Sequence, residues 1–284
     1  MTQTPRTPPD LTIQPRDLSF GAKASDRRWW LGDDPVATTF FNALSTTFPH
    51  GERFFMDSVR RYRDQVPPTL KAQIAGFLSQ EAMHTREHIV FNKQVADHGV
   101  DVAALEARVK ARLDFARTRP ALQQLGATIA MEHFTAILAH ALLADPRHME
   151  GASDEAKAMW RWHAIEEVEH KAVAYDTFLA ATQNMPGWRR WALRVSTMGA
   201  STWILFGTVG RNIADIFTAH GVNRPATWRR LFAYLLIRPG VLRQVLGAYL
   251  SYFLPGFHPW NHDDRALAAA AERGLVTAYG GAAS

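Results

Sequence analysis

The spacing of apolar residues predicts helices from about Asp34 onward. Apolar side chains recur every three or four residues, and no stretch shows the alternation of a β-strand bounded by turn residues. Asp34 followed by Pro35 is typical of a helix start, because aspartate caps helices and proline fits their first turn. This first helical region runs to about Val66, and Pro49-His50-Gly51 should divide it into two helices or kink it.

Proline, glycine and aspartate signals separate four further predicted helices. Their expected ranges are 69–97, 102–118, 121–143 and 153–182. Long helices with short connections favour an antiparallel bundle, so the predicted fold class is all-α, with a four-helix bundle over residues 31–185. Residues 1–30 are predicted to form an irregular arm, with Leu18, Phe20, Trp29 and Trp30 as its apolar contacts.

The last part of the chain, residues 186–284, has a different pattern and is predicted to be an appended helical region. Residues 191–209 are strongly apolar, and shorter helical segments follow at 227–237 and 241–253. The net charge of +5 is concentrated here, since nine arginines face a single acid, Asp215, between Pro186 and His262. The arginines are Arg189, Arg190, Arg194, Arg211, Arg224, Arg229, Arg230, Arg238 and Arg243.

Three interpretations of this basic and apolar region stay open. Residues 191–209 are about as long as a minimal transmembrane span, although Arg194 interrupts them. Amphipathic helices with arginine and tryptophan could lie on an anionic membrane. The helices could also pack on the bundle or on a second subunit, as in a homodimer. Nucleic-acid binding is not expected, because the stretch contains no known motif and no lysine.

Composition narrows the chemistry further. The 284-residue chain has no cysteine, which excludes disulfides, thiolate metal sites and a cysteine nucleophile. The N-terminus lacks the apolar core of a signal peptide, so we expect a cytoplasmic protein, with membrane association through the C-terminal region as an open alternative.

Two helices carry similar sets of candidate metal ligands. Glu81, His84 and His88 fall within roughly 60° of one another around the second helix. His163, Glu167 and His170 do the same around the predicted helix 153–182. Each helix therefore presents one carboxylate and two imidazoles in one direction.

The other two long helices each add one glutamate. Glu52 begins an amphipathic run, and Glu132 lies in a helix that is apolar almost all round and should be central. A buried unpaired carboxylate costs several kcal/mol, and a metal ion is a ready partner. His133 points about 100° away from Glu132 and is left out. Glu169 should lie on the far side of its helix, solvated or salt-bridged, and the position of Glu166 is ambiguous.

One glutamate from each of two helices, together with Glu-x-x-His from each of the other two, is the ligand arrangement of carboxylate-bridged dimetal bundles. The sequence therefore predicts a centre with two metal ions, most simply iron, with manganese or zinc as alternatives. His88 is either a ligand or a hydrogen-bond partner of one. The competing interpretation is a core of hydrogen-bonded buried histidines. No catalytic residue beyond the ligands is predicted.

The run WRWHAIEEVEHKAVAYD, with SQEAMHTREH upstream, resembles the family described as predicted metal-dependent hydrolases. The resemblance extends over about residues 18–264 and includes the WNHDD segment. That family is similar to ferritin-like diiron proteins, and the order His163-x-x-x-Glu167-x-x-His170 resembles the last-helix motif of para-aminobenzoate N-oxygenase. The resemblance implies Glu52, Glu81, His84, Glu132, His163, Glu167 and His170 as ligands, whereas His88 departs from the N-oxygenase pattern.

Three functions follow as hypotheses. The first is a diiron oxygenase or oxidase that activates O₂ and oxidises a small-molecule or lipid-like substrate with the help of an electron donor. The second is a hydrolase in which two metal ions activate water. The third is an iron-handling protein.

Overall fold

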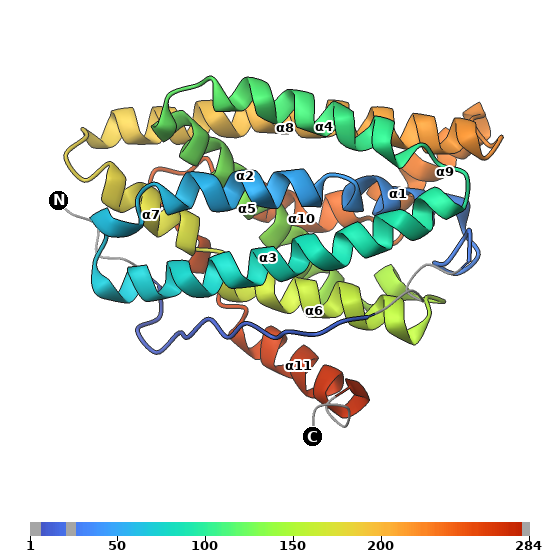
Figure 1. Cartoon of the computed structure of the whole chain (residues 1–284), viewed down its shortest axis with the longest axis horizontal. Coiled ribbons are helices and arrows are strands. Elements are labelled where there is room, and N and C mark those ends of the chain that lie inside the picture. Colours follow the sequence, from blue (N-terminus) through green and yellow to red (C-terminus); the bar gives the residue numbers. More distant parts are fainter. Residues whose placement is uncertain (1–6, 21–26, 280–284) are drawn as a thin grey trace.

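The computed structural model describes residues 7–20 and 27–279, and within these ranges the chain is helical and contains no β-strand (Figure 1). The predicted all-α fold class is confirmed. The helices are α1 Pro35–Ser45, α2 Phe48–Arg60, α3 Pro68–Asp97, α4 Val102–Arg117, α5 Ala121–Ala144, α6 Asp154–His170, α7 Val173–Ala181, α8 Gly187–Ala219, α9 Pro225–Leu236, α10 Val241–Ser251 and α11 Arg265–Tyr279. Short 3₁₀ turns lie at Arg63–Gln65, Pro146–Met149 and Pro259–Asn261.

The helices that carry the candidate ligands pack around one another. α2 lies against α3 and α5, α5 lies against α6, and α3 lies against α6 and α7. α5 is apolar and long enough to cross a membrane, but just over half of its most apolar stretch is buried inside the protein. It is therefore the central helix of the core, as the sequence predicted for the helix that holds Glu132.

The break in the first helical region lies earlier than predicted. Asp34 caps α1 as expected, accepting a hydrogen bond from the Val36 amide. The helix ends at Ser45, and α2 begins at Phe48 with Pro49 in its first turn. A proline there interrupts no helical hydrogen bond, so Pro49 starts a helix rather than breaking one.

The predicted fourth helix is divided into α6 and α7 at Lys171 and Ala172, directly after His170. The Lys171 ammonium is buried and donates to the His262 carbonyl at 2.7 Å and to Asp264 at 2.6 Å. It also lies 4.0 Å from the ring centroid of Trp260. The WNHDD segment therefore contacts the protein at the point where α6 ends.

The C-terminal helices form a layer on the core. α8 and α9 both pack on α1, while α8 and α10 both pack on α5 (Figure 1). The apolar stretch 191–209 lies inside the single long helix α8, which is not among the described helices that are long and apolar enough to span a membrane. α9 and α10 meet that criterion only when taken together, and they are bent by 51°. α11 was not predicted.

The N-terminal arm is irregular over its described part, as predicted. Ile13 packs so closely on Gly76 of α3 that a β-carbon at Gly76 would come within 2.8 Å of its Cγ2 atom. The Arg16 carbonyl accepts a hydrogen bond from the Trp162 indole of α6 at 3.1 Å. The arm therefore lies against the two helices that hold most of the candidate ligands.

Candidate metal centre

All eight residues that the sequence singled out lie together in the core. Each has at most 4% of its surface exposed. Their donor atoms form overlapping groups of three, with the atoms of each group within 4.8 Å of one another. The residues are Glu52 of α2, Glu81, His84 and His88 of α3, Glu132 of α5, and His163, Glu167 and His170 of α6.

Two carboxylates lie between the histidines of the cluster. One Glu167 oxygen is 2.8 Å from His163 Nε2, and the other is 3.4 Å from His170 Nε2. One Glu81 oxygen is 3.8 Å from His84 Nδ1, and the other is 3.3 Å from His170 Nε2. Glu132 adds an oxygen 3.5 Å from His170 Nε2. Glu81 and Glu167 thus each face two sides of the cluster.

Three histidines are oriented by a hydrogen bond at the ring nitrogen that points away from Glu81 and Glu167. His84 Nε2 pairs with Glu166 at 3.0 Å, and His170 Nδ1 pairs with Gln80 Oε1 at 2.9 Å. His163 Nδ1 pairs with His88 Nε2 at 2.7 Å. Such partners fix the tautomer and turn the other nitrogen toward the carboxylates of the cluster, where it could bind a metal.

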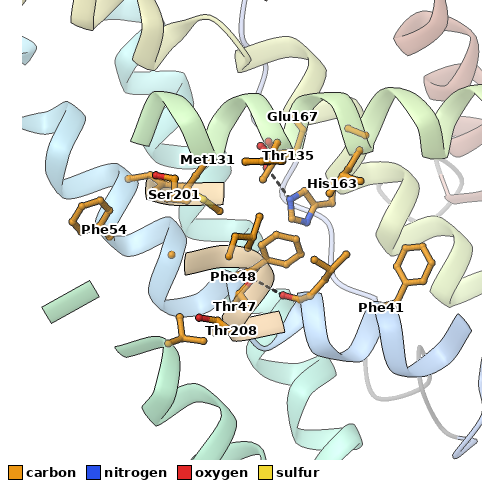
Figure 2. Close-up of a pocket in the computed structure, with 18 of the residues that line it drawn as sticks. Phe41, Thr47, Phe48, Phe54, Met131, Thr135, His163, Glu167, Ser201 and Thr208 are labelled. Atoms are coloured by element: carbon orange, nitrogen blue, oxygen red, sulfur yellow. Dashed lines mark hydrogen bonds and ion pairs between the residues drawn. The ribbon is translucent and has the colours of Figure 1, made fainter. Parts of the chain in front are cut away.

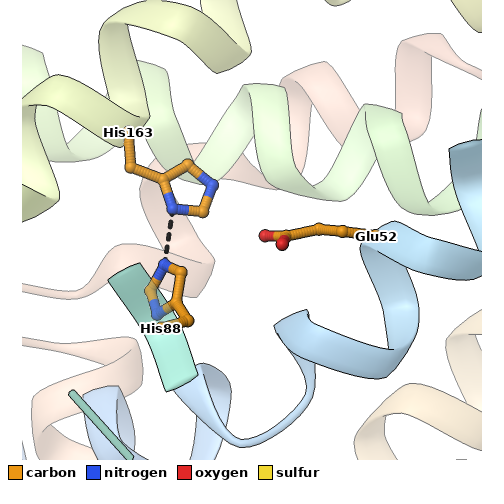
Figure 3. A group of neighbouring side chains, drawn as sticks. All are labelled: Glu52, His88 and His163. Atoms are coloured by element: carbon orange, nitrogen blue, oxygen red, sulfur yellow. Dashed lines mark hydrogen bonds between the residues drawn. The ribbon is translucent and has the colours of Figure 1, made fainter. Parts of the chain in front are cut away.

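His88 has both ring nitrogens in hydrogen bonds, and Figure 3 shows the one that it shares with His163. The Asn92 amide group donates to the Ser45 carbonyl at 3.2 Å and to Glu106 at 3.0 Å, so its oxygen accepts the Ser45 hydroxyl at 2.6 Å. The Ser45 oxygen then accepts from His88 Nδ1 at 2.8 Å, and His88 Nε2 accepts from His163. The sequence left two roles open for His88. This series of hydrogen bonds favours the role of hydrogen-bond partner to a ligand over that of a ligand.

The polar atoms that face the interior of the cluster have no hydrogen-bond partner among the described residues. They are both oxygens of Glu81 and of Glu132, one oxygen each of Glu52 and Glu167, His84 Nδ1 and His170 Nε2. Buried polar groups without partners are rare and destabilising. Because these atoms are oxygen and imidazole donors that converge on one region, the residues fit a bound metal.

The protonation of the cluster reflects burial and mutual repulsion. Burial, together with the neighbouring carboxylates, raises the pKa of Glu52 and Glu132 well above the usual range. Burial also raises the pKa of Glu81, to about 8. Burial works in the same direction on Glu167, but His170 and His163 outweigh it and hold its pKa well below the usual range. Cations at this position would compete with protons for the carboxylates.

Sequence reasoning missed the groups that support the ligands. Glu166, which the pattern left ambiguous, is fully buried and accepts a hydrogen bond from the Arg16 amide at 2.9 Å as well as pairing with His84. Glu169 forms an ion pair with Arg16 at 2.5 Å, which confirms the salt-bridged alternative. His133 lies outside the cluster, as predicted, with Nε2 3.1 Å from the Ala248 carbonyl. These partners come from distant segments, so helix periodicity carries no signal for them.

An apolar pocket of ≈ 170 Å³ adjoins the cluster (Figure 2). Of the eight residues, only His163 and Glu167 line it. Its walls are formed by side chains of α1, α2, α4, α5, α6 and α8, among them Phe48, Met131 and Leu205. The lining includes two exposed side chains, Arg112 of α4 and Ile204 of α8. An apolar molecule in this pocket would therefore lie between the surface and the His163 side of the cluster.

Comparison with known proteins assigns the chain to a family. The chain belongs to the family described as predicted metal-dependent hydrolase, whose family model matches residues 14–263. No curated protein and no solved structure matches the chain. The similarities to ferritin-like proteins and to para-aminobenzoate N-oxygenase therefore remain predictions.

The two histidines one turn apart on α3 should respond differently to substitution. We expect His84→Ala to lose at least one equivalent of metal, because its Nδ1 faces Glu81 and Glu167. His88→Ala should keep the full metal content at saturation and bind about 10–100-fold more weakly, as is usual when the partner of a ligand is removed. Metal analysis of both variants, with circular dichroism as the control for folding, tests this. Loss of metal from saturated His88→Ala would make His88 a ligand.

The metal-free protein should become less stable between about pH 6.5 and 8. The pKa of Glu81 is raised from 4.5 to about 8, so the folded state holds a proton that the unfolded chain has released. Stability from such a group is complete below the unfolded pKa and is lost as pH rises through the folded value. The raised pKa of His170, which its carboxylate neighbours maintain against burial, acts in the same direction above 6.5.

Thermal unfolding across this range measures the effect. We expect the unfolding temperature of metal-free protein to fall, and the stabilisation by added metal to grow, because the ion replaces the departing protons. Glu81→Gln should reduce the fall. A metal-free protein that gains stability from pH 6.5 to 8 would contradict this account.

Proposed function

We propose that the protein is an enzyme with two metal ions that hydrolyses an acyl bond in a long apolar substrate. Seven residues would hold the ions: Glu52, Glu81, His84, Glu132, His163, Glu167 and His170. The placement of Glu81 and Glu167 supports two ions rather than one. Each carboxylate has one oxygen toward His170 and the other toward His84 or His163. Four buried glutamates also match the four positive charges of two divalent ions.

Membership in the metal-dependent hydrolase family supports hydrolysis as the reaction class. Two metal ions held by these residues would supply Lewis-acid chemistry, activating water and polarising a carbonyl group. The protein's own residues orient the imidazoles that would bind the ions and shield them from solvent. Glu166, Gln80 and His88 hold the ligand imidazoles in place, so little reorganisation is needed during the reaction.

The pocket indicates the kind of substrate. Its wall next to the centre is His163 and Glu167, and most of the remaining lining is aliphatic or aromatic. A cavity of about 150 Å³ holds a benzene ring, so this pocket has room for a hydrocarbon group of similar volume. An acyl chain lying in the pocket would place its carbonyl beside His163 and Glu167.

Oxidation by a diiron form of the same centre is the second candidate. The observation that favours it is the donor set, since four carboxylates with imidazoles in a helical core suit iron in redox chemistry. The apolar pocket would then present a hydrocarbon group to the centre. This reaction would need O₂ and an electron donor, whereas hydrolysis needs neither.

A metal-dependent assay separates the two. Metal-free protein loaded with Zn²⁺ or Mn²⁺ without oxygen should release p-nitrophenol from long-chain p-nitrophenyl esters. Glu167→Gln should lower kcat at least about 100-fold, because Glu167 faces both sides of the centre and the pocket. Glu155→Gln, at the opposite end of the same helix, is the matched control. Turnover that appears only with Fe(II), O₂ and a reductant, with oxygen uptake, would replace hydrolysis by oxidation.

Chain-length preference tests the pocket itself. Ala127 lines the pocket and is only partly buried, so Ala127→Phe should fill the pocket without disturbing the core. We expect kcat/KM for dodecanoyl esters to fall about tenfold or more and that for acetyl esters to change little. Ala96→Phe, on the exposed side of α3, is the control. An equal loss for both esters would show that the chain does not occupy this pocket.

A further inference from the structure

Large apolar side chains are exposed on the three helices α8, α9 and α10. Trp203 of α8 has 84% of its surface exposed, far more than is usual for tryptophan in a soluble protein. We define the outer face by eight of the exposed apolar residues in and directly after these helices: Trp203, Phe206, Phe232, Leu236, Ile237, Leu246, Leu250 and Leu254. Grouped exposure of this kind marks an interaction surface.

The outer face lies on one layer of the protein. α8 and α9 share α1 as a packing partner, and α8 and α10 share α5. Side chains connect the layer directly: Thr202 of α8 meets the Tyr249 hydroxyl of α10 at 3.0 Å, and Phe217 of α8 stacks edge-on with Trp228 of α9. Because the inner sides of these helices pack on the core, their exposed apolar residues face away from it.

The surroundings of the outer face are positively charged. The segment that forms it carries nine arginines and one acid, Asp215, which is already paired with Arg108 at 2.6 Å. Arg189, Arg211, Arg229 and Arg238 are exposed and form no ion pair with the residues that the structure describes. A partner that covers this face should therefore be apolar and should carry negative charge.

We propose that the outer face binds the surface of an anionic lipid bilayer, with Trp203 and its apolar neighbours inserted among the acyl chains and the arginines at the phosphates. Helices of this composition bind membranes by buried apolar area together with attraction to anionic lipids. The α9–α10 pair is apolar enough to enter a bilayer but bent by 51°, which suits a helix pair lying in the interface. The charge excess favours lipid over a second copy of the chain, which would bring the same arginines together.

The same surface leads toward the candidate centre. Ile204 is next to Trp203, is 40% exposed and lines the pocket, together with Ser201, Leu205 and Thr208 of the same helix. A bilayer on the outer face would bring acyl chains to the edge of this pocket. This step rests on the proposed function and assigns a lipid-borne acyl compound as the substrate class.

Vesicle flotation tests the membrane contact without reference to activity. The full-length, metal-loaded protein should float with vesicles of equal phosphatidylglycerol and phosphatidylcholine and remain unbound with phosphatidylcholine alone. Trp203→Glu should reduce binding about tenfold, and Arg229→Glu should reduce it about fivefold or more and weaken its salt dependence. Ile89→Glu, at an exposed apolar residue of α3 outside the outer face, should bind like the wild type.

Each other outcome overturns the proposal. Wild-type protein that does not float with the anionic vesicles has no such contact. A Trp203→Glu variant that is folded and floats normally shows that another surface binds. If light scattering finds a dimer that Trp203→Glu dissociates, and vesicles are not bound, the outer face is covered by a second copy.

Activity then tests substrate delivery separately. Trp203→Glu should hydrolyse a soluble p-nitrophenyl ester at the wild-type rate and lose about tenfold on a long-chain ester embedded in anionic vesicles. Equal activity of wild type and variant on the embedded ester would reject delivery through this face. If the wild type hydrolyses neither ester, the proposed function fails while flotation still decides the membrane contact.

Discussion

The structure depends on the burial of four glutamates at one point between helices. Glu52, Glu81, Glu132 and Glu167 are nearly inaccessible to solvent, and isolated charges in such surroundings are strongly destabilising. In the chain itself, burial and repulsion raise the pKa of three of these carboxyls, and histidines offset only the fourth. Bound cations would offset this charge repulsion, and the histidines beside the carboxylates are already held by hydrogen bonds in one orientation. The helices around the cluster can be understood as a frame that keeps these donors close.

Helix periodicity predicted which residues form the cluster, because the candidate ligands on each helix are spaced by three, four or seven residues and so lie on one face. Residues three, four and seven apart lie on one face of a helix. The histidines and glutamate of each motif therefore point the same way from α3 and from α6. The supporting groups obey no such rule. Gln80 meets His170 across ninety positions of sequence, and Arg16 meets Glu166 across 150. The positions of helix ends were partly missed for a similar reason: the break after His170 coincides with Lys171 binding Asp264, a contact between segments that local sequence cannot anticipate.

The pocket and the outer face lie on the same side of the candidate centre. The candidate ligands His163 and Glu167 face an apolar space, whereas His84 and His170 are enclosed by Glu166 and Gln80. Chemistry at the centre is therefore accessible from one side, and that side is lined by the helix that also carries Trp203. Hydrolysis and oxidation would differ in what the ions do, but in both reactions the substrate would approach from this side. The family assignment favours hydrolysis, whereas the carboxylate-rich donor set favours oxidation.

Arg16 joins the two ends of the described chain at the centre. Its backbone amide binds Glu166, and its guanidinium binds Glu169 and, 256 residues later in the sequence, Glu272 of α11 at 2.9 Å. Contacts over such separations form late in folding, because long loops must close first. During synthesis the ribosome delivers Glu272 only after all the ligand-bearing helices have emerged. The support behind His84 is therefore complete only after every helix that carries a candidate ligand has been synthesised, so these helices must first pack together without the contact between Arg16 and Glu272.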